Sequence, residues 1–584
     1  MLMSDKTQQP HWLERYASDK YDWQSASANG RKTYYRPLGL VEFAFDADGR
    51  YYEGRADINA SIELDFRSSL GKHDLRERIL FAWTCLRCQH LLLQSKAIPW
   101  QPYMHDHLKL ERDLYFAAEA PNTLTQAIED GGANIVFLQD HYQDVNARDF
   151  WLHAQNIARL VDPDVALARL FVLPTTRDDE GYGKLRFLIV GSHQIWDGLT
   201  TYTWAREFVH LLNKPLDELR ACLTECLEPK SVFMHLPLPQ EALYPPVVGS
   251  PARKRWFWLL TRILRHVRKP LPAGFPNPLL RREDPKAATF SPVYRAVFDY
   301  TRIPPLNTTH CQASATSTGT QRLHRLCKEA NVSIGAGCFA LAALLMMEFH
   351  ERLEPDVPLA ERKPFITGFP LNPRPFLSRK TDPDSLMLAF SDGIMMPFLS
   401  SSLDLDGRIR LLARQAHRQL GAYQKRIRPQ DNMTGHQYMS SRGAGRVLAI
   451  QYLSSIERGD ALLPPELRKG INPQGAYPMR PNNTRQTCGV SSVGRRDILI
   501  DRNMYDLNDL SKDFVADYRV LNAGVRARDG EFLIGVAGTA TDIGAGVSVD
   551  ASSMDPTLVA HWQQRFRTIL DEAPKNEIDS RAKL

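Results

Sequence analysis

The chain has 584 residues, more than one ordinary hydrophobic core holds, so it predicts several domains or two large ones. Hydrophobic residues make up 43% and charged residues 24%, which excludes a mostly disordered chain. The formal net charge of +6 is too small over this length to indicate nucleic acid as a partner.

Cysteine usage and hydropathy indicate a cytoplasmic protein. The eight cysteines have no framework spacing, which argues against a disulfide-stapled secreted scaffold. Cys85 and Cys88 form a lone CxxC inside an apolar pattern and are expected to be buried thiols. No secretory signal pattern is visible in residues 1–12. The longest apolar run, Cys338–Met347, is about half of the ~20 residues that a membrane-spanning helix needs.

The first half predicts a strand, a tight loop and a helix in succession. Residues 1–60 have weak periodicity and predict short strands and loops, whereas 75–93 has the apolar spacing of an amphipathic helix. Residues 184–190 are dense in strand formers, and helical spacing begins at Leu199. The polar loop between them is therefore held by two rigid elements, as functional loops often are.

Residues 236–309 are broken by many prolines and predict an irregular crossover between two halves. Within it, Arg253–Lys269 has seven basic residues and no acidic ones. Its predicted apolar stripe consists of Trp256, Phe257, Leu260, Ile263, Leu264 and Val267. Such a helix either packs this stripe on the body of the protein, or lies on an anionic membrane or holds a phosphate-bearing ligand.

The second half repeats the mixture of strands and helices. Residues 336–349 predict an almost wholly apolar, buried helix, and 365–377 predict a strand that ends near Arg374. Further strands are expected at 532–537 and 546–549. The last helix is expected to begin at Asp555-Pro556, an N-cap acid followed by a first-turn proline.

The motif His193-Gln-Ile-Trp-Asp197-Gly198 carries the clearest chemical signal. A neutral imidazole with a pKa near ~6.5 can take a proton from a hydroxyl or an amine as that group attacks a carbonyl. Asp197 is expected to hold the loop through a bond to a distant arginine, and Gly198 to allow a tight turn. The alternative is a buried histidine followed by an aspartate that only caps the loop.

With its flanking elements, this motif resembles the active-site signature of the chloramphenicol-acetyltransferase-like superfamily. That superfamily includes CoA-dependent acyltransferases of the BAHD type, fungal trichothecene-type acetyltransferases and the condensation domains of peptide synthetases. The segments 331–349, 369–377, 488–494 and 546–570 follow in the order that the second lobe of the family would show.

The resemblance implies roles for particular residues. His193 is similar to the general base of the family, Asp197 to its structural acid and Arg374 to the arginine that pairs with this acid from the second lobe; the alternative for Arg374 is an ordinary surface residue at a strand end. Ser491 and Ser492 resemble a small polar segment near the substrate, where a hydroxyl could donate to the oxyanion, unless they form only a turn. The resemblance implies no metal, and no metal-ligand spacing is present in the sequence.

The implied fold is α/β, with two chloramphenicol-acetyltransferase-like lobes, each a mixed sheet covered by helices, and an active-site tunnel between them. The predicted boundaries are residues 1–240 for the first lobe, 241–310 for the crossover and 311–584 for the second lobe. The resemblance also implies a monomer without a permanently bound cofactor.

The implied function is transfer of an acyl group from acyl-CoA, as co-substrate, to a hydroxyl or amine of a small-molecule acceptor, and the family analogy implies specialised metabolism as its context. Position 192 is Ser, where ordinary condensation domains have a second histidine, and this argues against standard peptide-bond formation. Three alternatives remain: a condensation-type enzyme that uses a carrier-protein thioester, a cyclisation or isomerisation in the same tunnel, and a non-catalytic binding scaffold.

Overall fold

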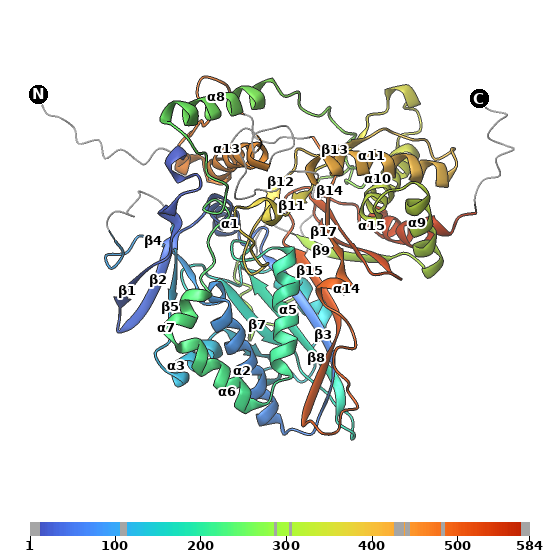
Figure 1. Cartoon of the computed structure of the whole chain (residues 1–584). Coiled ribbons are helices and arrows are strands. Elements are labelled where there is room, and N and C mark those ends of the chain that lie inside the picture. Colours follow the sequence, from blue (N-terminus) through green and yellow to red (C-terminus); the bar gives the residue numbers. More distant parts are fainter. Residues whose placement is uncertain are drawn as a thin grey trace, which may run out of the picture.

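The computed structural model describes residues 12–105, 114–284, 289–302, 307–424, 437, 444–479 and 485–573. Within these residues the chain forms two principal sheets, each covered by helices (Figure 1). Residues 1–11 and, in the predicted crossover, 285–288 and 303–306 lie outside this description.

The first lobe is built on a five-stranded sheet with the strand order β15-β3-β8-β7-β6. Its strands are β3 (Ile58–Ser68), β6 (Ile135–Phe137), β7 (Ala168–Val172), β8 (Tyr182–Gly191) and β15 (Phe514–Val525). Neighbouring strands are antiparallel, except that β6 and β7 are parallel. The strand predicted at 184–190 is the central strand β8. Phe187 and Ile189 enter one core cluster and Leu188 and Val190 another, which explains its unbroken apolar run.

Helices cover both faces of this sheet. On one face lie α2 (Lys72–Gln89) and α5 (Gly198–Leu212), with α3 (Leu124–Gly132), α6 (Leu216–Leu227) and α7 (Pro229–Met234) outside them (Figure 1). On the other face lies α4 (Ala147–Ala154), whose Phe150 and Trp151 pack in the same cluster as Leu188. The helices predicted near 75–93 and from Leu199 are thus α2 and α5, and Cys85 and Cys88 are buried thiols, as expected.

A second sheet of the first half has the order β1-β2-β5-β4. Its strands are β1 (Gln24–Ala28), β2 (Arg31–Pro37), β4 (Lys96–Pro99) and β5 (Leu114–Glu119). Residues Leu40–Tyr51 form helix α1, although the sequence predicted only strands and loops before residue 60. The polar residues Glu42, Asp46 and Asp48 of α1 are buried, so the helix has no solvent-facing polar side for a periodicity argument to detect.

The second lobe contains a four-stranded sheet with the order β14-β16-β17-β9. Its strands are β9 (Thr308–Ser314), β14 (Gly489–Arg495), β16 (Phe532–Gly538) and β17 (Ile543–Asp550); two short pairs are β10 (Phe365–Thr367) with β13 (Ile394–Met396) and β11 (Pro370–Leu371) with β12 (Ala389–Phe390). The continuous strand predicted at 365–377 is therefore wrong. Two short strands are followed by one turn of 3-10 helix that begins at Arg374, because prolines 370, 373 and 375 interrupt the ladder.

Helix α10 (Ile334–Leu353) is the core helix of the second lobe. It packs against α9 (Ser317–Glu329), α11 (Leu405–Gln424) and α15 (Pro556–Thr568), and Asp555 caps the last of these as predicted. Among the described residues, α10 is the one helix long and apolar enough to span a membrane. Because 78% of its most apolar stretch is buried inside the protein, α10 is explained as a core helix.

The division into lobes differs from the prediction in one respect. Strand β15 lies within residues 311–584, which were predicted to form the second lobe, yet it pairs with β3 in the first sheet. The chain reaches it through β14 and the short helix α14 (Arg496–Leu499), with Val490 in the core of the second lobe and Val493 against that of the first. The second half therefore contributes a strand to both principal sheets.

Helices α8 (Pro251–Val267) and α13 (Ala444–Leu462) lie along the upper edge of the molecule in Figure 1. Phe257 and Trp258 of α8 pack with Tyr452 of α13 in a separate core cluster. The predicted apolar stripe of α8 is therefore only partly correct: Phe257 is buried, but Trp256 and Val267 are exposed.

Candidate active site

The loop that carries His193 joins the end of β8 to the start of α5. Ser192 donates its backbone N–H to the carbonyl of Leu167 at 2.9 Å, which continues the strand contacts by one residue. Trp196 is buried and stacks on Trp204 of α5, with ring centroids 5.2 Å apart. A Cβ at Gly191 would lie 3.0–3.1 Å from the Trp196 ring, so glycine allows this indole to fold back under the strand.

The imidazole of His193 stacks on Phe45 of α1, with ring centroids 4.0 Å apart and an interplanar angle of 12°. The ring is partly exposed to solvent, whereas its Nδ1 atom is buried and has no hydrogen-bond partner. Nδ1 is therefore closed to molecules in solvent.

Burial lowers the pKa of His193 to about 4, because desolvation disfavours the imidazolium form. The Arg528 guanidinium lowers this pKa further, while nearby backbone groups and the Asp197 carboxylate act in the opposite direction. The ring is consequently neutral at physiological pH, which is the form that accepts a proton.

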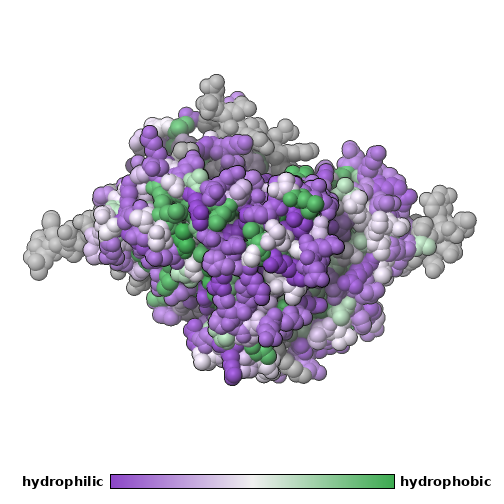
Figure 2. Space-filling model, turned by 90° about the horizontal axis from the view of Figure 1, so that it is seen from below, coloured by the Kyte–Doolittle hydropathy of each residue, from purple (hydrophilic) through white to green (hydrophobic). Residues whose placement is uncertain are grey.

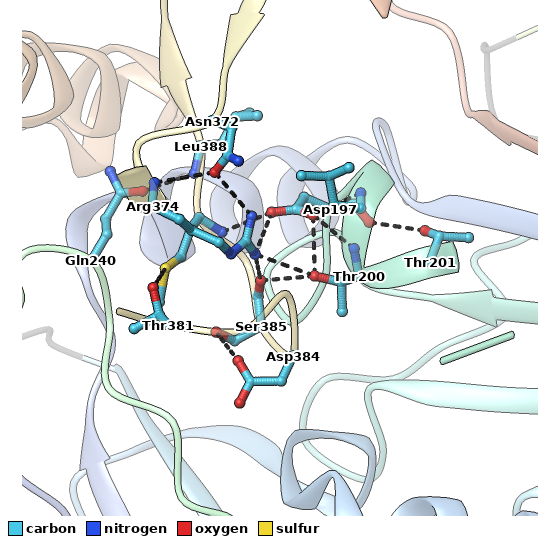
Figure 3. Close-up of polar contacts among 12 residues, drawn as sticks. Asp197, Thr200, Thr201, Gln240, Asn372, Arg374, Thr381, Asp384, Ser385 and Leu388 are labelled. Carbon is cyan, nitrogen blue, oxygen red and sulfur yellow. Dashed lines mark hydrogen bonds and ion pairs between the residues drawn. The ribbon is translucent and has the colours of Figure 1, made fainter. Parts of the chain in front are cut away.

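Asp197 is turned toward Arg374 of the second lobe (Figure 3). Its Oδ1 accepts hydrogen bonds from the backbone N–H groups of Leu199 and Thr200, both at 3.0 Å, and so caps α5. Its Oδ2 accepts from Arg374 Nη2 at 2.8 Å and from the Met387 N–H at 3.0 Å. Asp197 therefore fixes the start of α5 and binds the second lobe at the same time.

Arg374 completes this contact from the second lobe. Besides Asp197, its Nη2 donates to the carbonyl of Ser385 at 2.5 Å and lies 3.4 Å from the hydroxyl of Thr200 (Figure 3). The hydroxyl of Thr200 in turn donates to the Ser385 carbonyl at 2.9 Å. Arg374 and Asp197 are 7% and 3% exposed, so the alternative of a surface arginine does not apply.

Gly198 has a different structural role from the one predicted. Among the described residues, it is not one of the glycines with a positive φ, so a tight turn does not explain it. A Cβ at this position would lie 3.3 Å from Cγ1 of Val493 in β14. Gly198 therefore allows β14 to lie close to the first turn of α5.

Ser491 and Ser492 lie in β14, next to that contact. The Ser492 hydroxyl accepts a hydrogen bond from the Gly494 N–H at 3.2 Å, and the described contacts link neither serine to His193. The structure thus places this strand beside the motif without joining either hydroxyl to the imidazole.

The second lobe also approaches His193 through apolar residues. Phe45 packs with Leu386, Leu388 and Phe390, which belong to the segment after Arg374. The imidazole therefore lies where α1 of the first half meets residues 386–390 of the second half. No sequence pattern pointed to Phe45, because α1 was not predicted.

Arginines surround this region on the side of Asp48. Arg528 Nη2 lies 2.6 Å from Asp48. Burial lowers the pKa of Arg528, but the carboxylates of Asp48 and Glu531 outweigh this effect, so its pKa is raised. The Arg458 guanidinium lies 3.7 Å above the Phe390 ring, has no ion pair within the described part of the chain, and has a pKa lowered by burial to about 10. No sequence motif connects these residues, so their arrangement around this region could be seen only in the three-dimensional structure.

Comparison with known proteins supports the fold. No family model matches the sequence, and no curated protein matches it significantly. Trichothecene 15-O-acetyltransferase TRI3 from Fusarium sporotrichioides is similar in structure, with 11% identity over 94% of this chain and 96% of that chain, and a TM-score of 0.61.

Two further solved structures align over similar lengths. The condensation domain of the monacolin K polyketide synthase MokA is 12% identical over 94% of this chain and 97% of that one, with a TM-score of 0.49. Polyketide synthase associated protein 5 from Mycobacterium tuberculosis is 13% identical over 92% and 98%, with a TM-score of 0.46. At these identities, the likeness to the acetyltransferase shows the fold alone.

Proposed function

We propose that this chain, which has the two-lobed fold of the chloramphenicol-acetyltransferase-like superfamily, is an acyltransferase. It would move an acyl group from a CoA thioester to a hydroxyl or amine of a small-molecule acceptor, with His193 as general base. The observation that carries this proposal is a partly exposed, neutral imidazole at the junction of the two halves, on a loop held by the Asp197–Arg374 pair.

The proposed reaction uses Nε2 of His193. This atom takes the proton of the acceptor hydroxyl as the oxygen attacks the thioester carbonyl, which gives a tetrahedral oxyanion and an imidazolium. The C–S bond then breaks and the imidazolium returns the proton to the thiolate, so that an ester and free CoA thiol leave. General-base catalysis of this kind contributes typically about 10²–10⁴-fold, and positioning of the two substrates supplies much of the rest.

Asp197 is a positioning residue in this proposal. Both of its oxygens are occupied by the α5 cap, Arg374 and Met387, so it is not free to relay a proton. Its function is to keep the loop, and with it His193, at the junction. Gly198 supports the same geometry by admitting β14.

An oxyanion donor is also needed, and Ser491 or Ser492 would supply it. The supporting observation is that β14 lies against Gly198, which directly follows the histidine loop. A donor of this type typically contributes about 10²–10³-fold in rate. Replacement of each serine by alanine tests this role: loss of an oxyanion donor lowers the transfer rate, whereas loss of a serine with only a structural role in the strand does not.

The first test is turnover of a panel of short acyl-CoA thioesters with alcohol and amine acceptors, followed by thiol release. His193→Ala is expected to abolish transfer while far-UV circular dichroism stays unchanged. Val165→Ala, a change at an exposed position, serves as the matched control. Unchanged thiol release in His193→Ala would instead identify a binding scaffold.

The alternative is a condensation-type enzyme that takes its acyl group from a carrier protein, or one that cyclises or isomerises its substrate at the same site. Its support is the resemblance of the His193 motif to the signature of a superfamily that includes condensation domains. Parallel assays with one acyl group on CoA and on a phosphopantetheinyl carrier decide between donors. Product formation without any thioester would identify non-acyl chemistry.

A further inference from the structure

Helix α8 has apolar residues on two opposite faces. At 3.6 residues per turn, Phe257, Trp258 and Thr261 share the face toward the body, and all three are buried. Trp256, Leu260 and Val267 share the opposite face and are 63%, 38% and 63% exposed; Leu259 beside them is 42% exposed. The inner face is sufficient to dock the helix on α13, so the outer apolar face has no packing role within the described structure.

Two arginines near the start of α8 flank the same outer face. Arg253 and Lys254 lie in the first turn and Arg255 follows; all three are exposed and have no ion pair with any described residue. Cations in the first turn oppose the helix dipole, so they do not stabilise the helix itself. Arg253 and Arg255 flank the apolar face on its two sides. By contrast, Arg265 is buried against Glu457.

The lower face of the molecule and two other strongly exposed apolar residues differ from α8. The face in Figure 2, seen from below, is mostly hydrophilic, and its apolar residues form small separate groups. Val165 and Leu510 are 62% and 79% exposed, but Asp164 and Asp509 stand next to them in the chain. Unlike these two positions, the exposed apolar face of α8, which lies along the upper edge in Figure 1, is flanked by cations.

We propose that α8 docks this chain on an anionic lipid bilayer. The helix would lie parallel to the membrane, with Trp256, Leu260 and Val267 in the interfacial region and the arginines and lysines beside lipid phosphates and carboxylates. At 1.5 Å per residue it offers a contact about 25 Å long. A tryptophan on such a face is suited to the boundary between headgroups and acyl chains. The proposal does not depend on the proposed acyl transfer.

The test is co-sedimentation of the full chain with vesicles of phosphatidylcholine, with and without about 30 mol % phosphatidylserine, at about 0.05 M and 0.5 M salt. Binding is expected only to the anionic vesicles and only at low salt. Arg253→Gln with Arg255→Gln is expected to weaken partitioning by about fivefold for each charge removed. Trp256→Ser with Leu260→Ser is expected to abolish it.

Controls separate insertion from general charge attraction. Val165→Ser with Leu510→Ser removes equally exposed apolar residues and is expected to leave binding unchanged. Brominated lipids are expected to quench the fluorescence of the bound wild type, and this quenching is expected to disappear in Trp256→Phe although the variant still sediments. Each of these positions is exposed, so the variants are expected to fold, which circular dichroism checks.

Three results would overturn the proposal. They are absence of binding to anionic vesicles at low salt, binding that the Trp256 and Leu260 substitutions leave intact, and a dimer in analytical ultracentrifugation that these substitutions dissociate. The last result would assign the face to a second copy of the chain.

Discussion

His193 and His310 each have a pKa that burial lowers to about 4, but their surroundings differ. The ring of His310 stacks on Trp151 at 4.4 Å, and its Nε2 lies 2.6 Å from the amide nitrogen of Gln155. His193 also stacks on an aromatic ring, yet its buried Nδ1 atom has no hydrogen-bond partner among the described residues. His310 is thus engaged in structural contacts, whereas His193 is the histidine that we propose to meet a substrate.

The first prediction concerns the pH dependence of transfer. A general base acts only when neutral, so kcat/KM is expected to fall as the pH drops through about 4, the pKa of His193, and not near the ordinary value of about 6.5. Initial rates between pH 4 and pH 8, with circular dichroism at each pH to verify folding, measure this limb. A limb centred near pH 6.5 in a folded enzyme would contradict the burial of the ring.

The second prediction concerns stability in acid. Because the folded pKa of His310 lies below the unfolded value of about 6.5, the unfolded chain binds the proton first, and stability is lost as the pH falls from about 6.5 to about 4. Between pH 7 and pH 5, this one group should cost about 2 kcal/mol. Chemical denaturation of His310→Gln measures this contribution. Its free energy of unfolding is expected to fall less between pH 7 and pH 5 than that of the wild type, by about 2 kcal/mol.

A histidine on the surface provides the control for this measurement. The side chain of His73 is 89% exposed, and His73→Gln is expected to keep the wild-type dependence on pH. Equal dependence in all three proteins would show that His310 does not set the acid sensitivity.

At the scale of elements, the histidine loop is held by the two carboxylate oxygens of one side chain, Asp197. Asp197 caps α5 with one oxygen and binds Arg374 and the Met387 N–H with the other. The cap is a local property of the helix, whereas the arginine comes from the turn after β11, far along the chain. The element that presents His193 is therefore complete only when the second lobe is folded against it.

The third prediction tests this connection. Asp197→Ala and Arg374→Ala are each expected to destabilise the fold by about 3–5 kcal/mol, because each leaves a buried charge unpaired. The double variant is expected to cost less than the sum, with a coupling of at least about 1 kcal/mol in denaturant titrations. Additive effects would show that the two residues act independently and would remove the proposed positioning role of Asp197.

At the scale of the whole molecule, the two halves are joined by one strand of the second half that pairs in the first sheet, and by the packing around His310. Strand β15 of the second half completes the first sheet, and its Gly524 lies directly against the ring of His310 in β9. Trp151 of α4 stacks on the same ring, with centroids 4.4 Å apart. The junction thus depends on close approach of three elements.

The fourth prediction follows from this approach. A Cβ at Gly524 would lie 2.0 Å from Cε1 of His310, so Gly524→Ala must displace the ring and is expected to cost about 1–3 kcal/mol. Gly335→Ala in α10 is the matched control, since a Cβ there meets nothing within 4 Å, and it is expected to stabilise by about 0.5–1 kcal/mol. Thermal unfolding of both variants measures the difference, and equal effects would contradict the close packing.

Much of the local structure was predictable because its signals lie within a few neighbouring residues. The apolar run of β8, the helical spacing of α5 and the Asp555-Pro556 start of α15 all formed as expected. Helix α1 was missed because burial of its acids conceals its periodicity. The predicted apolar stripe of α8 combined residues that lie on its buried face with residues that lie on its exposed face. The spacing of apolar residues does not show which side of a helix faces the protein.

The chemical motif around His193 could be recognised in the linear chain, since imidazole, carboxylate and glycine stand within one short loop between a strand and a helix. The partners of that loop could not be read in this way. Phe45, Leu386 and Arg528 are distant in sequence, and folding alone brought them beside the ring. The pairing of β15 with β3 is likewise a contact between segments distant in sequence, which no local pattern predicts. Short-range patterns follow from backbone geometry, whereas long-range contacts depend on how complete surfaces fit together, which no local spacing records.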